Sequence, residues 1–240
     1  MTNWASRPYK ALMRDYQLEA DQPRRAAIFL PGWDTEAATG CLCIQRALEM
    51  GVVDLTTKII AVEREPALID NIARRLKSFG FKTPPVLHHG ELADLRLTPK
   101  TIDFAMIDLL GTLDHRLAHW IEHDLGPSFV PGASMSITLT RTYRNNYFME
   151  ESRFVWRNDT TLRRLAIRYG QEHGITDDEV LIHLVILKSC LAAFDADYQR
   201  VQLYRDNQRT MLACRFDNLT RRRPIWPTTA TVLAAVSTVS

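Results

Sequence analysis

Short apolar runs alternate with helical patterns through the first 140 residues of the chain. Runs such as Ala26–Leu30 and Lys58–Val62 are almost continuously apolar, which is typical of strands buried on both faces of a parallel sheet. Between them, the stretch from Pro66 to Phe79 repeats apolar residues at the spacing of a helix with one buried face. The expected strands are residues 26–30, 58–62, 85–88, 102–107 and 134–140, and the expected helices between them are residues 35–50, 66–79 and 115–123.

Beyond Thr140 the pattern changes. Two helices are expected, over residues 160–169 and 177–194, followed by two alternating segments, Tyr198–Tyr204 and Arg209–Phe216, around a polar turn. Regular alternation of strand and helix favours right-handed crossovers. We therefore predict an α/β fold, a doubly wound, mostly parallel Rossmann-like sheet that ends in an antiparallel hairpin. The domain occupies residues 26–220, between an amino-terminal segment (1–25) and a carboxyl-terminal tail (221–240).

Composition adds few constraints. The 240 residues carry a formal net charge of +2, with the positive excess in the last hundred residues. No apolar run approaches the roughly 20 residues of a membrane span, and the first residues lack the apolar core of an export signal. The four cysteines form no CxxC pair, so we expect reduced thiols in a cytoplasmic protein rather than a zinc site.

The candidate chemistry lies directly after the strands, because ligands of doubly wound sheets bind beyond the carboxyl ends of their strands. Pro31–Trp33 forms a turn after the first strand, and Glu63, Glu91 and Asp108 follow the next three. Packing does not require an acid at each of these ends. Together the acids predict an acceptor-rich pocket, suited to the hydroxyls, amine and sulfonium of an adenosyl ligand. Nearby Glu65 is interpreted as the cap of the following helix.

With these stretches the chain resembles the class I S-adenosylmethionine-dependent methyltransferases. The matching segments are AIFLPG, KIIAVEREPALIDNIARRL, HHGELADL, IDFAMIDLLGTL and VPGASMSITLT, and the late hairpin fits the two strands that close the family's sheet. The resemblance implies S-adenosylmethionine as cofactor and an unidentified methyl acceptor. It implies a cofactor loop at Gly32 and Trp33, a ribose ligand in Glu63, an adenine site at Glu91 and Leu92, and a methionine-end contact in Asp108.

Two rival interpretations stay open. Only Gly32 follows the first strand, where the family has a glycine-rich loop. This departure favours a non-catalytic Rossmann-like binding or assembly module. A turn with so few glycines is similar to that of divergent methyltransferase-like proteins found in phages. A nucleotide-binding protein is a weaker alternative, because the GxGxxG turn is absent. No catalytic residue is identified; Asp108 and His88 are the only candidates for a general base.

Three histidines, His115, His119 and His123, recur every fourth residue and share one helix stripe. Such a stripe can bind zinc. However, the apolar residues of the same helix mark the opposite side as buried, so we interpret the histidines as a solvated face and predict no metal.

Basic and aromatic residues interleave just after the fifth strand. Arg141, Tyr143, Arg144 and Tyr147 combine cations for phosphates with rings for stacking on bases. A loop anchored by its aromatic side chains would give the same pattern. We therefore treat nucleic acid as a candidate partner through these four residues.

Overall fold

A computed structural model describes residues 15, 17, 18, 23–31, 41–109, 111, 113–140, 160–194, 198–206 and 209–220. Its centre is a seven-stranded sheet with strand order β3-β2-β1-β4-β5-β7-β6. The strands are β1 (Arg24–Phe29), β2 (Val53–Glu63), β3 (Val86–His89), β4 (Ile102–Asp108), β5 (Phe129–Thr140), β6 (Tyr198–Asp206) and β7 (Arg209–Leu219). The first five run parallel, and β7 lies antiparallel between β5 and β6. The predicted fold class is confirmed.

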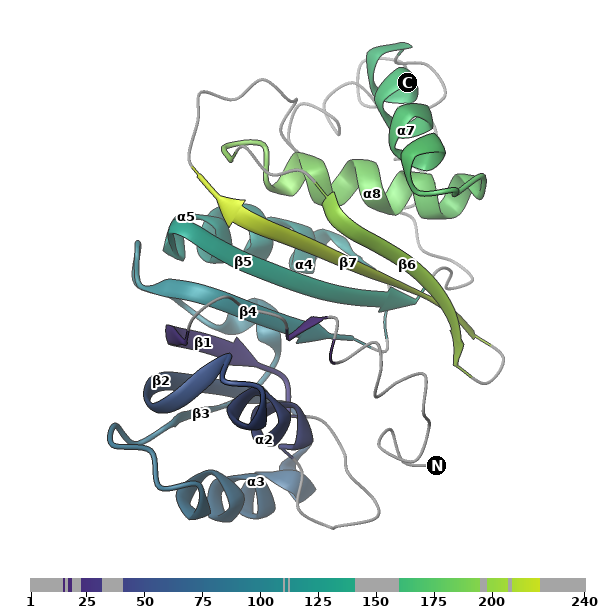
Figure 1. Ribbon diagram of the computed structural model, residues 1–240. Coiled ribbons are helices and arrows are strands. Elements are labelled where there is room, and N and C mark those ends of the chain that lie inside the picture. The colour runs from purple at the N-terminus through teal and green to yellow at the C-terminus, as the bar shows by residue number, and fades with distance from the viewer. Residues whose placement is uncertain are drawn as a thin grey trace.

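Helices cover both faces of the sheet (Figure 1). One face carries α2 (Leu42–Glu49) and α3 (Pro66–Ser78), and the other carries α4 (His115–Trp120) and α8 (Asp178–Cys190). Alternate residues of each central strand serve the two cores. Ala27 and Phe29 pack with α2 and α3, whereas Ala26 and Ile28 join the core under α4 and α8. The shorter elements are η2 (Leu92–Asp94), η3 (Ile121–Leu125), α5 (Gly126–Ser128) and α7 (Thr160–Glu172).

Helices α2 and α3 each bury a narrow stripe of side chains. In α2 the buried side chains are Cys43, Ile44 and Ala47, while Leu42 and Leu48 are only half-buried. In α3 Ala73 is exposed, because the buried stripe narrows to Ile72 and Leu76. The first part of the helix expected over residues 35–50 lies outside the described residues.

Pro131 and Gly132 lie in a bulge within β5, ahead of the strand expected over residues 134–140. Register with β4 shifts from Ile102↔Phe129 to Phe104↔Ser134, so extra residues of β5 loop out there. Proline has no amide to donate to a ladder, and Gly132 has φ +83°, so a bulge tolerates both. The strand therefore starts earlier than its apolar pattern indicates.

Helix α4 presents the histidines as expected. Leu117, Trp120 and Ile121 are buried, whereas His115, His119 and His123 are exposed. The helix continues beyond Trp120 as the π-helical turn η3, so the histidine stripe crosses two kinds of helix.

The half of the sheet built by β5 and β7 is polar on the α2 side. Ser134, Ser136, Thr138 and Thr140 are all buried there, alternating with residues that enter the opposite core. Part of the amino-terminal segment lies over this row. The side-chain amide of Gln17 donates to the Thr138 hydroxyl. The backbone carbonyl of Gln17 accepts from Ser136 Oγ at 3.0 Å.

The same segment is tied to α2 and to the core beside it. Asp15 accepts two hydrogen bonds of 2.9 Å from the Arg46 guanidinium, and Leu18 is fully buried. The part of residues 1–25 that the structure describes before β1 therefore packs as a cover of the sheet. Within the described ranges no helix is long and apolar enough to cross a membrane.

Candidate functional site

Two of the acids end the strands that flank β1, each two residues beyond the end of β1 itself. Phe29 of β1 pairs with Ala61 of β2 and with Met106 of β4. Two residues beyond these pairs, Glu63 ends β2 on one side of β1 and Asp108 ends β4 on the other. Because neighbouring strands lie about 4.8 Å apart, the two acids are separated by about 10 Å across the β1 end. Strand order reverses at β1 and β4, which is where ligand crevices form in such sheets.

Glu63 has a local structural role besides its place in the crevice. Its Oε1 atom accepts hydrogen bonds from the backbone amides of Arg64 and Glu65, both at 2.9 Å. These bonds fix the turn that leads from β2 into α3. Both use the same oxygen, so the second carboxylate oxygen, Oε2, is the acceptor that a ligand would use.

Glu65 lies at the cap position expected of it, but it does not cap α3 through its side chain. Glu65 occupies the N-cap position of α3, with Pro66 beginning the helix, but its side chain makes no capping hydrogen bond. A glutamate at this position has a longer side chain than the residues that cap best. The carboxylate that satisfies amides at this end belongs to Glu63, two residues earlier.

Glu91 lies beside Glu63 across the β2–β3 pair. Glu63 and His89 are paired, and the Gly90 amide donates to the Glu63 carbonyl at 3.0 Å. The Glu91 carboxylate meets Arg64 Nη1 at 3.3 Å, and both side chains are exposed. Arg64 was not singled out from sequence, since an isolated arginine after a strand carries no signal of its partner. Leu92, by contrast, is buried at the start of η2 and belongs to the core on the α4 and α8 side of the sheet.

Asp108 ends β4 half-buried and pairs with Thr138 of β5. Thr138 is the residue to which Gln17 donates, so the amino-terminal segment reaches the strand next to Asp108. No sequence pattern indicated this approach, because Gln17 lies in a polar stretch that shows no period. The structure thus adds Gln17 and Thr138 to the neighbourhood of the site.

His88 is half-buried near the end of β3. Its Nε2 atom is buried without a hydrogen-bond partner, and a side chain at Gly90 would place a Cβ 3.0 Å from that atom. Nε2 is therefore covered in this conformation, whereas the other candidate base, Asp108, ends β4 half-buried.

The thiol of Cys41 is not suited to act as a nucleophile. It precedes α2 and is fully buried. Burial raises the pKa of its thiol to about 12, against a smaller opposing effect of the Arg75 charge. The thiol is therefore protonated at neutral pH and lacks the reactivity of a thiolate.

Some predicted residues cannot be compared with the structure. Gly32 and Trp33 of the turn after β1, and Arg141, Tyr143, Arg144 and Tyr147 after β5, lie outside the described residues. Among the residues that are described, no three histidine, cysteine or acidic side chains come together to hold a metal ion.

Comparison with known proteins gives matches in structure alone. Neither a family model nor a curated protein matches the sequence. A methyltransferase from Mesorhizobium loti that depends on S-adenosylmethionine aligns with a TM-score of 0.51 and 11% identity, over 89% of this chain and 99% of the other. The chain has the fold of these methyltransferases.

Two further structures share this fold. The N-methyltransferase NodS from Bradyrhizobium japonicum, in complex with S-adenosylhomocysteine, aligns at a TM-score of 0.52 and 12% identity, over 88% of each chain. Geranyl diphosphate methyltransferase, in complex with S-adenosylmethionine, aligns at 0.53 and 10% identity, over 87% of this chain and 85% of that one. Identities this low establish the architecture and leave the chemistry to the site.

Proposed function

We propose that the protein is a methyltransferase that uses S-adenosylmethionine. The observation that carries the proposal is that Glu63 and Asp108 end β2 and β4 on either side of β1, each two residues beyond the residue paired with Phe29. With one strand between them, the backbones of the two acids are about 10 Å apart. That separation suits a ligand with hydroxyls at one end and a cationic centre at the other.

The described residues fit such a ligand in three ways. Glu63 keeps one carboxylate oxygen for ribose hydroxyls while the other holds the turn. Leu92 provides an apolar contact for the adenine base. Glu91 accepts a hydrogen bond from the exocyclic amine of that base when the ion pair between Arg64 and Glu91 opens. Asp108 carries a negative charge toward the end where a sulfonium would lie.

In the proposed reaction, a bound cofactor supplies a methyl group whose bond to sulfur breaks as the bond to the acceptor nucleophile forms. The chain's contribution is to hold the nucleophile in line and to exclude water, which is the proximity effect of a preorganised site. Asp108 is placed to receive the proton that the acceptor loses.

The test is calorimetric titration of the full chain with S-adenosylmethionine and with S-adenosylhomocysteine, with ATP and NAD as controls. We expect micromolar binding of the first two and none of the controls. Preference for ATP or NAD would support a nucleotide-binding protein instead.

The second candidate is a non-catalytic module of the same fold. It is favoured by the single glycine after β1, at a turn where the family's loop is glycine-rich. No binding of either sulfur ligand at millimolar concentration would make it the better account. A cytoplasmic location, supported by four buried cysteines that form no disulfide, and a kinship with phage proteins belong to the same proposal.

A further inference from the structure

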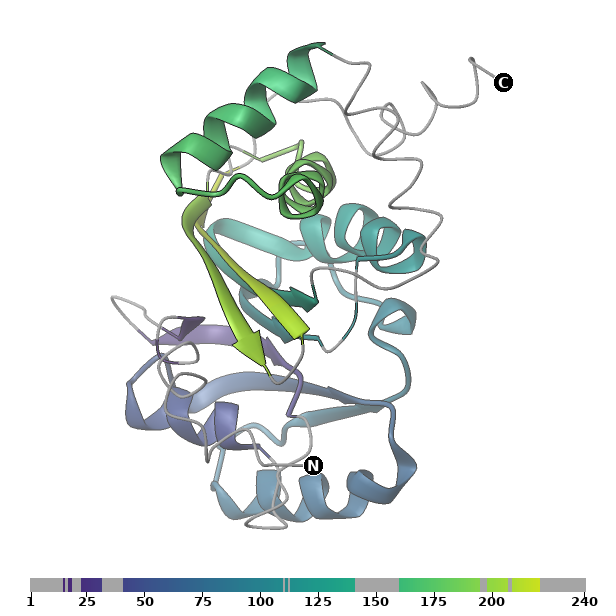
Figure 2. The same cartoon turned by 90° about the vertical axis from the view of Figure 1, so that its right-hand side faces the viewer.

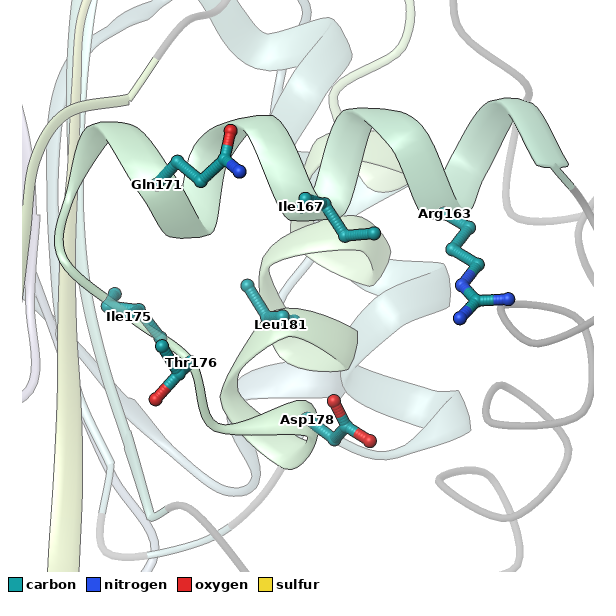
Figure 3. Close-up of a pocket in the computed structure, with 7 residues that line it drawn as sticks. All are labelled: Arg163, Ile167, Gln171, Ile175, Thr176, Asp178 and Leu181. Atoms are coloured by element: carbon teal, nitrogen blue, oxygen red, sulfur yellow. The ribbon is translucent and has the colours of Figure 1, made fainter.

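A pocket lies away from the crevice, between α7 and α8 (Figure 3). It has a volume of about 560 Å³, within the range of pockets that bind small groups. Helix α7 packs on α8 through Ala166 and Tyr169, which are buried. The turn between the helices lies on the side of the molecule where the parallel strands end, which Figure 2 faces.

The floor of the pocket is apolar and one wall is exposed. Ile175 and Leu181 are buried at 6% and 5% exposure, whereas Ile167 of α7 is 40% exposed. Figure 3 shows Ile167 and Leu181 facing the space from opposite helices. An aliphatic side chain left open beside a buried apolar floor offers a surface on which a planar ring can lie.

Polar groups of three kinds surround this floor. Gln171, Thr176 and Asp178 supply an amide, a hydroxyl and a carboxylate. Asp178 is not needed to cap α8, because Asp177 Oδ1 already accepts from the Glu179 and Val180 amides at 3.0 and 3.3 Å. These are the groups that read the edges of nucleobases, with a carboxylate accepting from an exocyclic amine.

Cations stand along the helix that forms one wall. Arg163, Arg164 and Arg168 of α7 are all exposed, and Arg163 also lines the pocket. Arg168 meets Glu172 at 3.5 Å, but both side chains are more than half exposed, so this pair is weak. Exposed arginines on successive turns of a helix match the phosphates of a nucleic-acid strand.

We propose that the α7–α8 pocket binds an unpaired base of a single-stranded nucleic acid whose phosphates lie on the arginines of α7. A base must leave its stack to enter a pocket, which favours a single strand over a duplex. Asp178 favours a base with an exocyclic amine, which can donate to its carboxylate. It disfavours an acidic peptide, because the peptide carboxylates would be repelled by the Asp178 carboxylate. The site stands without methyl transfer; if the proposed function also holds, the strand is the methyl acceptor.

The experiment measures binding of the full chain, without cofactor, to fluorescent 12-nucleotide oligo(C), oligo(A) and oligo(U) at several salt concentrations. The triple variant R163Q/R164Q/R168Q should bind at least tenfold more weakly at low salt. A plot of the logarithm of the binding constant against the logarithm of salt concentration should become less steep by about 2, because each lost phosphate contact contributes about 0.7 to the slope. The matched control R74Q/K77Q/K82Q removes the same charge from exposed positions around α3 and should bind like wild type.

Specificity is tested by Asp178→Asn, with melting temperature measured to confirm folding. We expect the preference for oligo(C) or oligo(A) over oligo(U) to fall at least about fivefold. The proposal is overturned if wild type binds no strand in a salt-dependent way, or if the control triple weakens binding equally. It is also overturned if poly-glutamate or a duplex of the same length binds more tightly. Calorimetry with S-adenosylmethionine remains a separate readout, so failure here leaves the proposed function standing.

Discussion

The Glu63 carboxylate accepts the backbone amide of Glu65 at 2.9 Å, so the acid at the end of β2 also shapes the start of α3. Removal of this carboxylate therefore affects both folding and the proposed ligand. Glu63→Ala should lower the free energy of unfolding by about 1–2 kcal/mol, since two amides lose their acceptor. It should also weaken binding of S-adenosylmethionine at least tenfold. Urea unfolding and calorimetry measure the two effects.

Two companion variants separate these roles. Glu63→Gln keeps an acceptor oxygen for the turn but loses the negative charge. Its free energy of unfolding should therefore stay close to that of wild type, while it binds S-adenosylmethionine as weakly as Glu63→Ala does. Glu65→Ala should change neither quantity, because the Glu65 side chain makes no capping bond. A marked loss of stability in Glu65→Ala would contradict this assignment.

The Arg64–Glu91 ion pair should compete with the ligand for Glu91. Both side chains are exposed, at 73% and 49%, so the pair contributes little to folding. Arg64→Gln should leave stability unchanged and tighten S-adenosylmethionine binding by up to about fivefold. Arg74→Gln on α3 is the control. Weaker binding in the Arg64 variant would instead mean that Arg64 contacts the ligand itself.

Asp217 should stabilise the protein above acidic pH. Burial by itself would raise its pKa, but hydrogen bonds from Arg215 and Ser134, with the charges of Arg215 and Arg24, outweigh burial and lower the pKa. Arg215 holds it through two bonds of 2.8 Å. Because the folded pKa lies below the unfolded one, the stabilisation is complete above about pH 4 and is lost as pH falls further.

Asp217→Asn should therefore cost about 2–3 kcal/mol at pH 7 and reduce the acid dependence of stability below pH 4. Urea unfolding from pH 7 to pH 3 measures it. Asp70→Asn, an exposed position on α3, should show the wild-type profile. An unchanged acid limb in Asp217→Asn would show that another group dominates acid unfolding.

His183 should oppose folding as pH falls below neutrality. It is completely buried in α8, where its Nδ1 lies 2.7 Å from the Glu179 carbonyl oxygen and its Nε2 has no partner. Burial lowers its pKa, against smaller opposing effects of Glu179 and Asp177. Below the unfolded pKa of about 6.5 the unfolded chain binds a proton that the folded one does not, so stability declines.

His183→Leu should flatten the pH dependence of unfolding between pH 7 and pH 5, because it removes that proton linkage. His119→Leu, at an exposed position of α4, should leave the slope as it is. Equal slopes in wild type and His183→Leu would mean that the imidazole protonates inside the folded protein.

Gly170 allows α7 to approach the turn that follows it. A Cβ there would lie 2.8 Å from Leu181 Cδ2 and closer still to the Ile175 carbonyl oxygen. Gly170→Ala should cost about 1–3 kcal/mol by overpacking, and it should widen the α7–α8 pocket. Gly111→Ala, with open space around it, is the control. A neutral Gly170→Ala would show that α7 can shift without loss.

The sequence by itself determined the order of the elements and the fold. Five apolar runs separated by helical patterns, such as Ile59–Val62 before Pro66, require a sheet buried on both faces, and the late hairpin followed from its alternation. These signals are local, because each depends on residues a few positions apart. For the same reason the acids at the strand ends could be found, since the end of a strand is visible in the sequence.

The tertiary structure alone decided what those residues touch. It placed Arg64 against Glu91, and it placed Gln17 against Thr138, which lies 121 positions away in the chain. It also placed Arg163 of α7 and Leu181 of α8 in the lining of one pocket. It also showed that Glu65, at the N-cap position of α3, makes no capping bond, and that the Glu63 carboxylate holds the turn before the helix. Such contacts depend on the packing of elements distant in the chain, where no periodicity of the sequence records the partner.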